Sequence, residues 1–110
     1  MEKQRNIAIL GTGNLGIAIA QGLRDSGFLE NRKLFLTRRK PELIQSMQSD
    51  VIQVTADNPD AVSNAGIIIL AVQPGQLPHL LEEIQPALDS DKHVLVSVIT
   101  AVSISDIASK

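Results

Sequence analysis

Short apolar runs alternate with segments of helical periodicity along the chain, and this order constrains the fold more than any other feature. Strands are predicted at residues 7–10, 34–37, 51–54, 67–72 and 93–98. Helices are predicted at residues 14–26, 41–48, 59–64 and 76–88. This alternation indicates an α/β fold, a mainly parallel sheet with helices on both faces. Right-handed crossovers then favour a doubly wound sheet with strand order 3-2-1-4-5.

Single residues mark the limits of two of these helices. In the first helix, Leu15, Ile19 and Leu23 form one apolar stripe. Gly27 follows, and a glycine in the left-handed conformation is a common helix end. Pro86 is predicted to distort or end the helix at residues 76–88, because it lacks a backbone N–H and clashes with the preceding turn.

Two further helix starts carry cap signals. Asn58 is predicted to cap the helix at residues 59–64, with Pro59 at its first position. Ser103 and Asp106 resemble a capping box that opens another helix. Lys110 follows about two turns later, which leaves that helix little packing of its own. We therefore expect one domain, residues 1–110, that belongs to a longer protein.

Composition excludes several classes of function. The 110 residues carry a net charge of −2, which gives no general attraction to nucleic acid or to an anionic membrane. With no cysteine and two separated histidines, neither thiolate chemistry nor a metal site is expected. Residues 1–6 lack the apolar core of a signal peptide, and no apolar run reaches the ~18 residues of a membrane span. The expected location is the cytoplasm.

A glycine-rich turn joins the first strand to the first helix. Gly11, Gly13 and Gly16 fit the pattern G-x-G-x-x-G in the strand-to-helix context that supports it. In a Rossmann-type fold these glycines allow a tight turn, a close approach of pyrophosphate and close packing of helix on strand. Free N–H groups near Asn14 and Leu15 would then point at the phosphates. The alternative is a plain structural turn, which the three glycines and both flanks disfavour.

The end of the second strand indicates which dinucleotide binds. An NAD site usually has an acid about 20 residues after the glycines, to hold the ribose 2′-hydroxyl. Residues 34–39 contain no acid, and the strand ends in Thr37, Arg38 and Arg39, followed by Lys40. Guanidinium groups and a hydroxyl suit a 2′-phosphate, so NADP(H) is favoured over NAD(H). The alternative for these cations is a solvated surface turn.

The end of the fourth strand is the second candidate contact. In open parallel sheets, ligands lie beyond the carboxyl ends of the strands where the strand order reverses. Ala71 and Val72 are small enough there to leave room for the nicotinamide, and Pro74 stiffens the turn after Gln73. A plain strand-to-helix turn is the alternative.

Residues 9–16, 71–74 and 94–107 together resemble pyrroline-5-carboxylate reductase. The resemblance covers nearly the whole chain, but only the amino-terminal part of those enzymes. It implies NADPH-dependent reduction of an imine, Δ1-pyrroline-5-carboxylate, to proline in proline biosynthesis. It also implies a helical carboxyl-terminal domain that forms a homo-oligomer and shapes the substrate site. This chain alone is therefore expected to be inactive.

The resemblance also implies which residues contact the cofactor. The pyrophosphate would be held by Leu10, Gly11, Thr12, Gly13, Asn14 and Leu15. The adenosine half would be met at its 2′-phosphate by Thr37 and Arg38, and at its ribose by Asn58. The nicotinamide side would be lined by Ala71, Val72 and Gln73, with Val98 and Thr100 nearby.

Two departures from the family bear on the substrate. Gln73 stands where the family usually has lysine, and Ala101 where it usually has glycine. These changes leave the cofactor interpretation intact and the substrate open. We assign no catalytic residue, because surface positions are expected for Asp57, Asp60, His79, Glu82 and His93. The alternatives are a non-catalytic NADP-binding module and another NADP oxidoreductase, of the deazaflavin-dependent NADP reductase or hydroxyacid dehydrogenase type.

Overall fold

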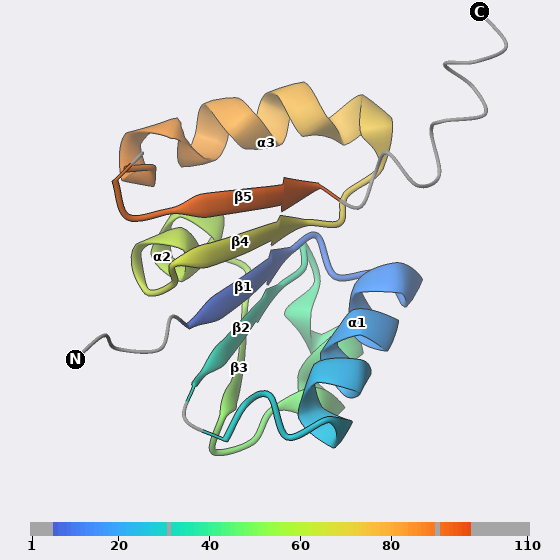
Figure 1. The fold of residues 1–110 in the computed structure, drawn as a ribbon. Coiled ribbons are helices and arrows are strands. Elements are labelled where there is room, and N and C mark those ends of the chain that lie inside the picture. Colours follow the sequence, from blue (N-terminus) through green and yellow to red (C-terminus); the bar gives the residue numbers. More distant parts are fainter. Residues whose placement is uncertain (1–5, 31, 90, 98–110) are drawn as a thin grey trace, which may run out of the picture.

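Five parallel strands form the centre of the molecule (Figure 1). The computed structural model describes residues 6–30, 32–89 and 91–97. The sheet has the order β3-β2-β1-β4-β5, so the predicted order is confirmed. Its strands are β1 (Ile7–Leu10), β2 (Leu34–Thr37), β3 (Ile52–Thr55), β4 (Ile67–Leu70) and β5 (Val94–Ser97).

Helices cover both faces of this sheet, as predicted. They are α1 (Asn14–Asp25), α2 (Asn58–Ser63) and α3 (Leu77–Ile84), with 3-10 turns η1 (Pro41–Met47), η2 (Pro74–Gln76) and η3 (Gln85–Ala87). The two faces have separate cores, which divide the alternating side chains of β1. Ile7 and Ile9 pack in the core beneath α1 and η1. Ala8 and Leu10 pack in the core beneath α2 and α3.

The buried face of α1 differs from the predicted stripe at one position. Leu15 is 43% exposed, whereas Gly16 and Ala20 are buried. The cause is the close packing of Gly16 on the end of β1. A Cβ at Gly16 would lie 3.1 Å from the Thr12 side chain and 3.3 Å from that of Ile9. This approach turns Gly16 and Ala20 inward and Leu15 outward.

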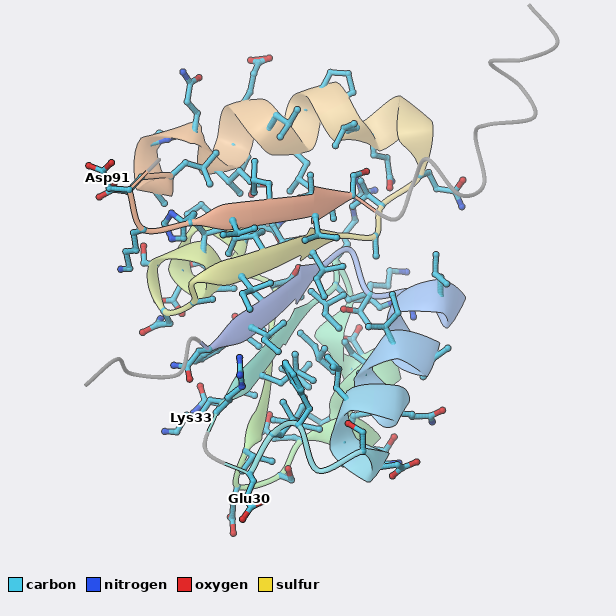
Figure 2. The ribbon with its side chains drawn as sticks, viewed as in Figure 1. Glu30, Lys33 and Asp91 are labelled. Carbon is cyan, nitrogen blue, oxygen red and sulfur yellow. The ribbon has the colours of Figure 1, made fainter. Side chains whose placement is uncertain are left out.

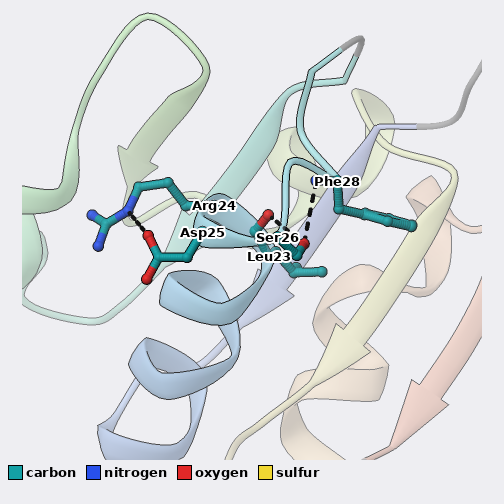
Figure 3. A network of polar contacts seen from close by, with 5 residues as sticks. All are labelled: Leu23, Arg24, Asp25, Ser26 and Phe28. Atoms are coloured by element: carbon teal, nitrogen blue, oxygen red, sulfur yellow. Dashed lines mark hydrogen bonds and ion pairs between the residues drawn. The ribbon is translucent and has the colours of Figure 1, made fainter.

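The end of α1 follows the predicted pattern (Figure 3). Gly27 has a φ of +81°, the left-handed conformation expected after the helix. The Ser26 hydroxyl donates to the Leu23 carbonyl over 3.0 Å and accepts from the Phe28 N–H over 3.2 Å. These bonds turn the chain back, so that Leu29 enters the core beneath α1.

The cap of α2 corrects the prediction made for Asn58. Asp57 is the cap residue, and its carboxylate accepts a hydrogen bond from the Asp60 N–H over 3.0 Å. Its backbone is extended (φ −96°, ψ 96°), as a cap residue requires. Asn58 is instead the first helical residue and Pro59 the second. Its side chain is therefore not used in capping and can reach another element.

The carboxyl-terminal part of the described chain agrees with the predicted elements only in outline. The predicted helix at residues 76–88 is three pieces, η2, α3 and η3, and α3 ends two residues before Pro86. β5 begins one residue later than predicted, and Val98 lies outside the described residues. The expected capping box at Ser103 and Asp106, the residue Thr100 expected near the nicotinamide, and Ala101 also lie outside them.

Charged side chains at the amino ends of the strands point away from the sheet. Figure 2 shows Glu30, Lys33 and Asp91 at this end, opposite the strand arrowheads. In the described part of the chain, no helix is long and apolar enough to cross a membrane. Nor do three histidines or acids gather there at a possible metal site.

Candidate functional site: a two-part cleft at the carboxyl ends of the strands

The turn after β1 is packed against the end of β4. Gly11 has a φ of +76°, which side-chain-bearing residues rarely adopt. A Cβ at Gly11 would also overlap the side chain of Val72. The Ala71 N–H donates to the Leu10 carbonyl over 3.0 Å, which extends the pairing of β1 and β4 to this point. The first and fourth strands therefore share a close contact where the strand order reverses.

The same turn is tied to the end of β2. The Thr37 carbonyl accepts from the Thr12 N–H over 2.7 Å, and the Thr37 hydroxyl accepts from the Gly11 N–H over 3.1 Å. The Arg38 guanidinium donates to the Thr12 carbonyl over 3.2 Å. Thr12 is fully buried, with its hydroxyl donating to the Ile9 carbonyl over 3.1 Å. These contacts fix the position of the glycine-rich turn relative to β1 and to the end of β2.

Helix α1 opens directly from this turn and presents free backbone N–H groups. Gly13 is its cap residue and offers no side chain to bond those groups, and the first turn holds no acid. The first N–H groups of a helix have no partner within the helix. A Cβ at Gly13 would meet no atom within 4 Å, so the approach to these groups is open. Open N–H groups and the positive helix end make a site for an anion.

A cleft of about 330 Å³, here called the loop cleft, lies over this turn. It brings together the three segments singled out in the sequence. Its lining comprises Gly11, Thr12, Gly13, Arg38, Arg39, Lys40, Ala71, Val72, Gln73 and Gln76. Three of these residues are cations and none is an acid, so the cleft suits a ligand that carries several negative charges.

A second cleft of about 230 Å³, here called the α3 cleft, adjoins the loop cleft through Gly11, Arg38, Arg39, Val72 and Gln76. It is also lined by Thr37, Ala56, Asn58, His79, Leu80 and Glu83. Asn58 Nδ2 donates to Glu83 Oε1 over 3.0 Å, joining α2 to α3 across this cleft.

Two further predicted site residues, Leu10 and Leu15, lie outside both linings. Leu10 is fully buried behind the turn and offers its carbonyl to Ala71. Asn14 opens α1, Leu15 is exposed beside it, and Pro74 opens η2. Thr37, by contrast, lines the α3 cleft, although it is only 1% exposed. Their predicted contacts with a ligand stay predictions.

Sequence reasoning missed the contribution of α3 and the turn before it. Gln76, His79 and Glu83 are spaced by three and four residues and line the α3 cleft. A signal was available, because polar residues at this spacing share one helix face. His79 and the neighbouring Glu82 were both expected at the surface, and both are exposed, but His79 also lines this cleft.

The fold and the clefts together define a class of protein. A parallel sheet in this order, with a glycine-rich turn that leads from β1 into a helix and clefts at the β1–β4 switch point, is a Rossmann-type dinucleotide-binding domain. Residues 6–101 match the family model described as "NADP oxidoreductase coenzyme F420-dependent", and the chain belongs to this family.

Curated relatives agree with the resemblance seen in the sequence. The chain is 41% identical to pyrroline-5-carboxylate reductase 2 of Dictyostelium discoideum, over 99% of this chain and 36% of that protein. It is 29% identical to pyrroline-5-carboxylate reductase 3 of Rattus norvegicus, over 96% of this chain and 38% of that protein. The chain thus spans little more than a third of the length of these relatives.

Solved structures agree in fold. A pyrroline-5-carboxylate reductase from Coxiella burnetii matches with a TM-score of 0.75 and 27% identity, over 84% of this chain and 34% of that one. The Plasmodium falciparum pyrroline carboxylate reductase with NADP bound matches with a TM-score of 0.68 over 87% of this chain and 34% of that one. Its 22% identity supports the fold alone.

Proposed function

We propose that this chain is the NADP(H)-binding domain of a pyrroline-5-carboxylate reductase. The observation that carries the proposal is the loop cleft, where the open helix end and the cations Arg38, Arg39 and Lys40 meet without an acid. The 41% identity to the Dictyostelium reductase supports the choice of reaction. NADPH would supply a hydride to the imine carbon of Δ1-pyrroline-5-carboxylate, and uptake of a proton at the imine nitrogen would complete the formation of proline and NADP⁺.

The residues of the two clefts have distinct tasks in this proposal. The free N–H groups at the start of α1 bind the pyrophosphate, and Gly13 leaves them accessible. Arg39, and Arg38 with the part of its guanidinium not used by Thr12, bind the 2′-phosphate. Ala71, Val72 and Gln73 form the wall beside the nicotinamide. Together they orient the reacting face, which is the contribution of the protein to hydride transfer.

We assign no catalytic acid within this chain. Among the described residues, the ionisable groups of the two clefts are Arg38, Arg39, Lys40, His79 and Glu83. In this proposal Arg38, Arg39 and Lys40 hold phosphate groups, whereas His79 and Glu83 line only the α3 cleft, which contains neither Ala71 nor Gln73. The proposed substrate contacts therefore belong to the rest of the protein and to a second subunit of a cytoplasmic homo-oligomer.

The activity is tested on the full-length protein with pyrroline-5-carboxylate and NADPH. We expect loss of NADPH absorbance that depends on the imine, together with formation of proline. Oxidation of NADPH by a deazaflavin instead would assign the other chemistry in the name of the matched family. No oxidation of NADPH at any substrate level would contradict the reductase proposal, and binding without turnover would favour a non-catalytic module.

Reversing the charge of Arg38 is expected to separate the two nucleotides. Arg38→Asp should weaken NADPH binding about 30- to 100-fold, because a cation beside the 2′-phosphate becomes a carboxylate. NADH binding should weaken only several-fold, through loss of the contact between Arg38 and the Thr12 carbonyl. Titration calorimetry of the full-length protein measures both.

Arg24→Asp is the matched control, because Arg24 is exposed in the last turn of α1 and lines neither cleft. It should leave both affinities unchanged. If Arg38→Asp weakened the two nucleotides equally, Arg38 would serve only to hold the turn, and the 2′-phosphate assignment would be wrong.

A further inference from the structure

The α3 cleft contains a carboxylate that the cofactor proposal does not use. Glu83 extends from α3 and lines the same cleft as Thr37, the last residue of β2, and Arg38 and Arg39, which follow it. NAD sites usually place an acid at the end of the second strand, and this chain has arginine there. The α3 cleft does contain an acid, but it comes from α3 and not from the end of the second strand.

The charge of Glu83 is not balanced by a cation. Within residues 6–30, 32–89 and 91–97, the only ion pair is that of Arg24 with Asp25. Neither Arg38 nor Arg39 lies within ion-pair distance of Glu83. The Glu83 carboxylate accepts a hydrogen bond from the neutral amide of Asn58, with 3.0 Å between Oε1 and Nδ2. A full negative charge thus lies beside the cationic wall of a cleft of about 230 Å³.

The contact with Glu83 also sets the orientation of Asn58. A carboxylate only accepts hydrogen bonds, so it must face the amide nitrogen of Asn58 and not the oxygen. The Asn58 Oδ1 atom is buried and has no donor among the described residues. Because Oδ1 has no partner there, the hydrogen bond to Glu83 is the contact that fixes the orientation of the Asn58 amide.

The two kinds of nucleotide present opposite chemistry to this carboxylate. The 2′-phosphate of NADPH is a monoester with a charge of about −1.5 to −2 near neutral pH, which a carboxylate repels. The 2′-hydroxyl of NADH is neutral and can donate a hydrogen bond to a carboxylate or accept one from an amide. Glu83 therefore favours the hydroxyl, whereas Arg38 and Arg39 favour the phosphate.

We propose that Glu83 is a specificity-determining residue, which lowers the preference of the α3 cleft for NADPH over NADH. The inference rests on the proposed function, since it assumes that the adenosine ribose occupies this cleft. It adds to that proposal a group on α3 that favours NADH over NADPH, so that the cleft can bind either nucleotide.

Glu83→Gln tests the role of the charge by itself. Glutamine has the same length and retains an oxygen that can accept from Asn58, so the contact between α2 and α3 is kept. The ratio of NADPH to NADH affinity, measured by calorimetry on the full-length protein, is expected to rise about three- to fivefold. The rise should shrink at high salt, because exposed charges are screened there.

Glu82→Gln is the matched control. Glu82 precedes Glu83 on α3, is exposed and lines neither cleft, so this variant removes the same charge elsewhere. Its affinity ratio should equal that of the unchanged protein. An equal ratio in both variants, or a shift of Glu83→Gln toward NADH, would overturn the role of Glu83.

The two proposals fail in different ways. An unchanged protein that binds neither nucleotide contradicts the proposed function, and this inference with it. An unchanged protein that binds NADPH, with a ratio that does not respond to Glu83→Gln, contradicts this inference alone.

Discussion

Replacing Gly13 with valine is expected to abolish most NADPH binding while the protein stays folded. The backbone of Gly13 is extended (φ −102°, ψ −151°), and its negative φ does not exclude a residue with a side chain. The added side chain meets no atom of the protein within 4 Å of its Cβ. It would instead occupy the space through which a pyrophosphate reaches the N–H groups of α1. We expect an affinity loss of at least about 100-fold, the size expected when a preorganised set of charge-assisted hydrogen bonds is lost.

Calorimetry and thermal unfolding of the same samples check this prediction. The free energy of unfolding should change by no more than about 1 kcal/mol, the usual scale for a changed cap residue. Gly22→Val is the control, because a Cβ at Gly22 is equally free of neighbours and Gly22 lines neither cleft. NADPH binding by Gly13→Val at the affinity of the Gly22→Val control would place the pyrophosphate elsewhere.

Replacing Gly11 with alanine is expected to have the opposite outcome, a protein that unfolds much more easily. Two costs combine at this position. A positive φ of +76° costs a residue with a Cβ about 1–2 kcal/mol. Overlap with Val72, whose Cα lies 3.1 Å from the new Cβ, forces β1 and β4 to shift, at about 1–3 kcal/mol. The sum, about 2–5 kcal/mol, is a large part of the stability of a small domain.

Gly27→Ala separates the two costs. Gly27 has a similar φ of +81°, but a Cβ there would meet no atom within 4 Å. Gly27→Ala should therefore lower the free energy of unfolding only by the cost of the positive φ, about 1–2 kcal/mol. Chemical denaturation measures both variants, and Val72→Ala in the Gly11→Ala background should restore part of the difference. Equal losses for Gly11→Ala and Gly27→Ala would show that Val72 does not confine the turn.

The sheet could be predicted because its evidence is local and repeated. Each strand is a short apolar run, and the handedness of parallel crossovers leaves few possible orders. The position of the loop cleft follows from the same order, because ligands of such sheets lie at the carboxyl ends beside the switch point. Gly11, Arg38 and Ala71 are far apart in sequence, yet they line one cleft.

Where the structure differs from the prediction, the difference depends on contacts that the spacing of residues in the sequence does not reveal. Asp57 and Asn58 are both good cap residues, and only the backbone path shows that Asp57 takes the role. Leu15 fits an apolar stripe, but the close packing of Gly16 decides which side of α1 faces the sheet. Glu83 reads as a surface acid, and only the position of α3 beside α2 reveals its contact with Asn58.

The bonds that tie the glycine-rich turn to β2 have a consequence for the rate of nucleotide capture. The three bonds, of 2.7, 3.1 and 3.2 Å, are made by the protein alone. The turn is thus shaped during folding, and no loop has to be ordered when the nucleotide arrives. Association is then expected to be fast and set by diffusion into a positively charged entrance, with differences between nucleotides appearing mainly in how long each one stays.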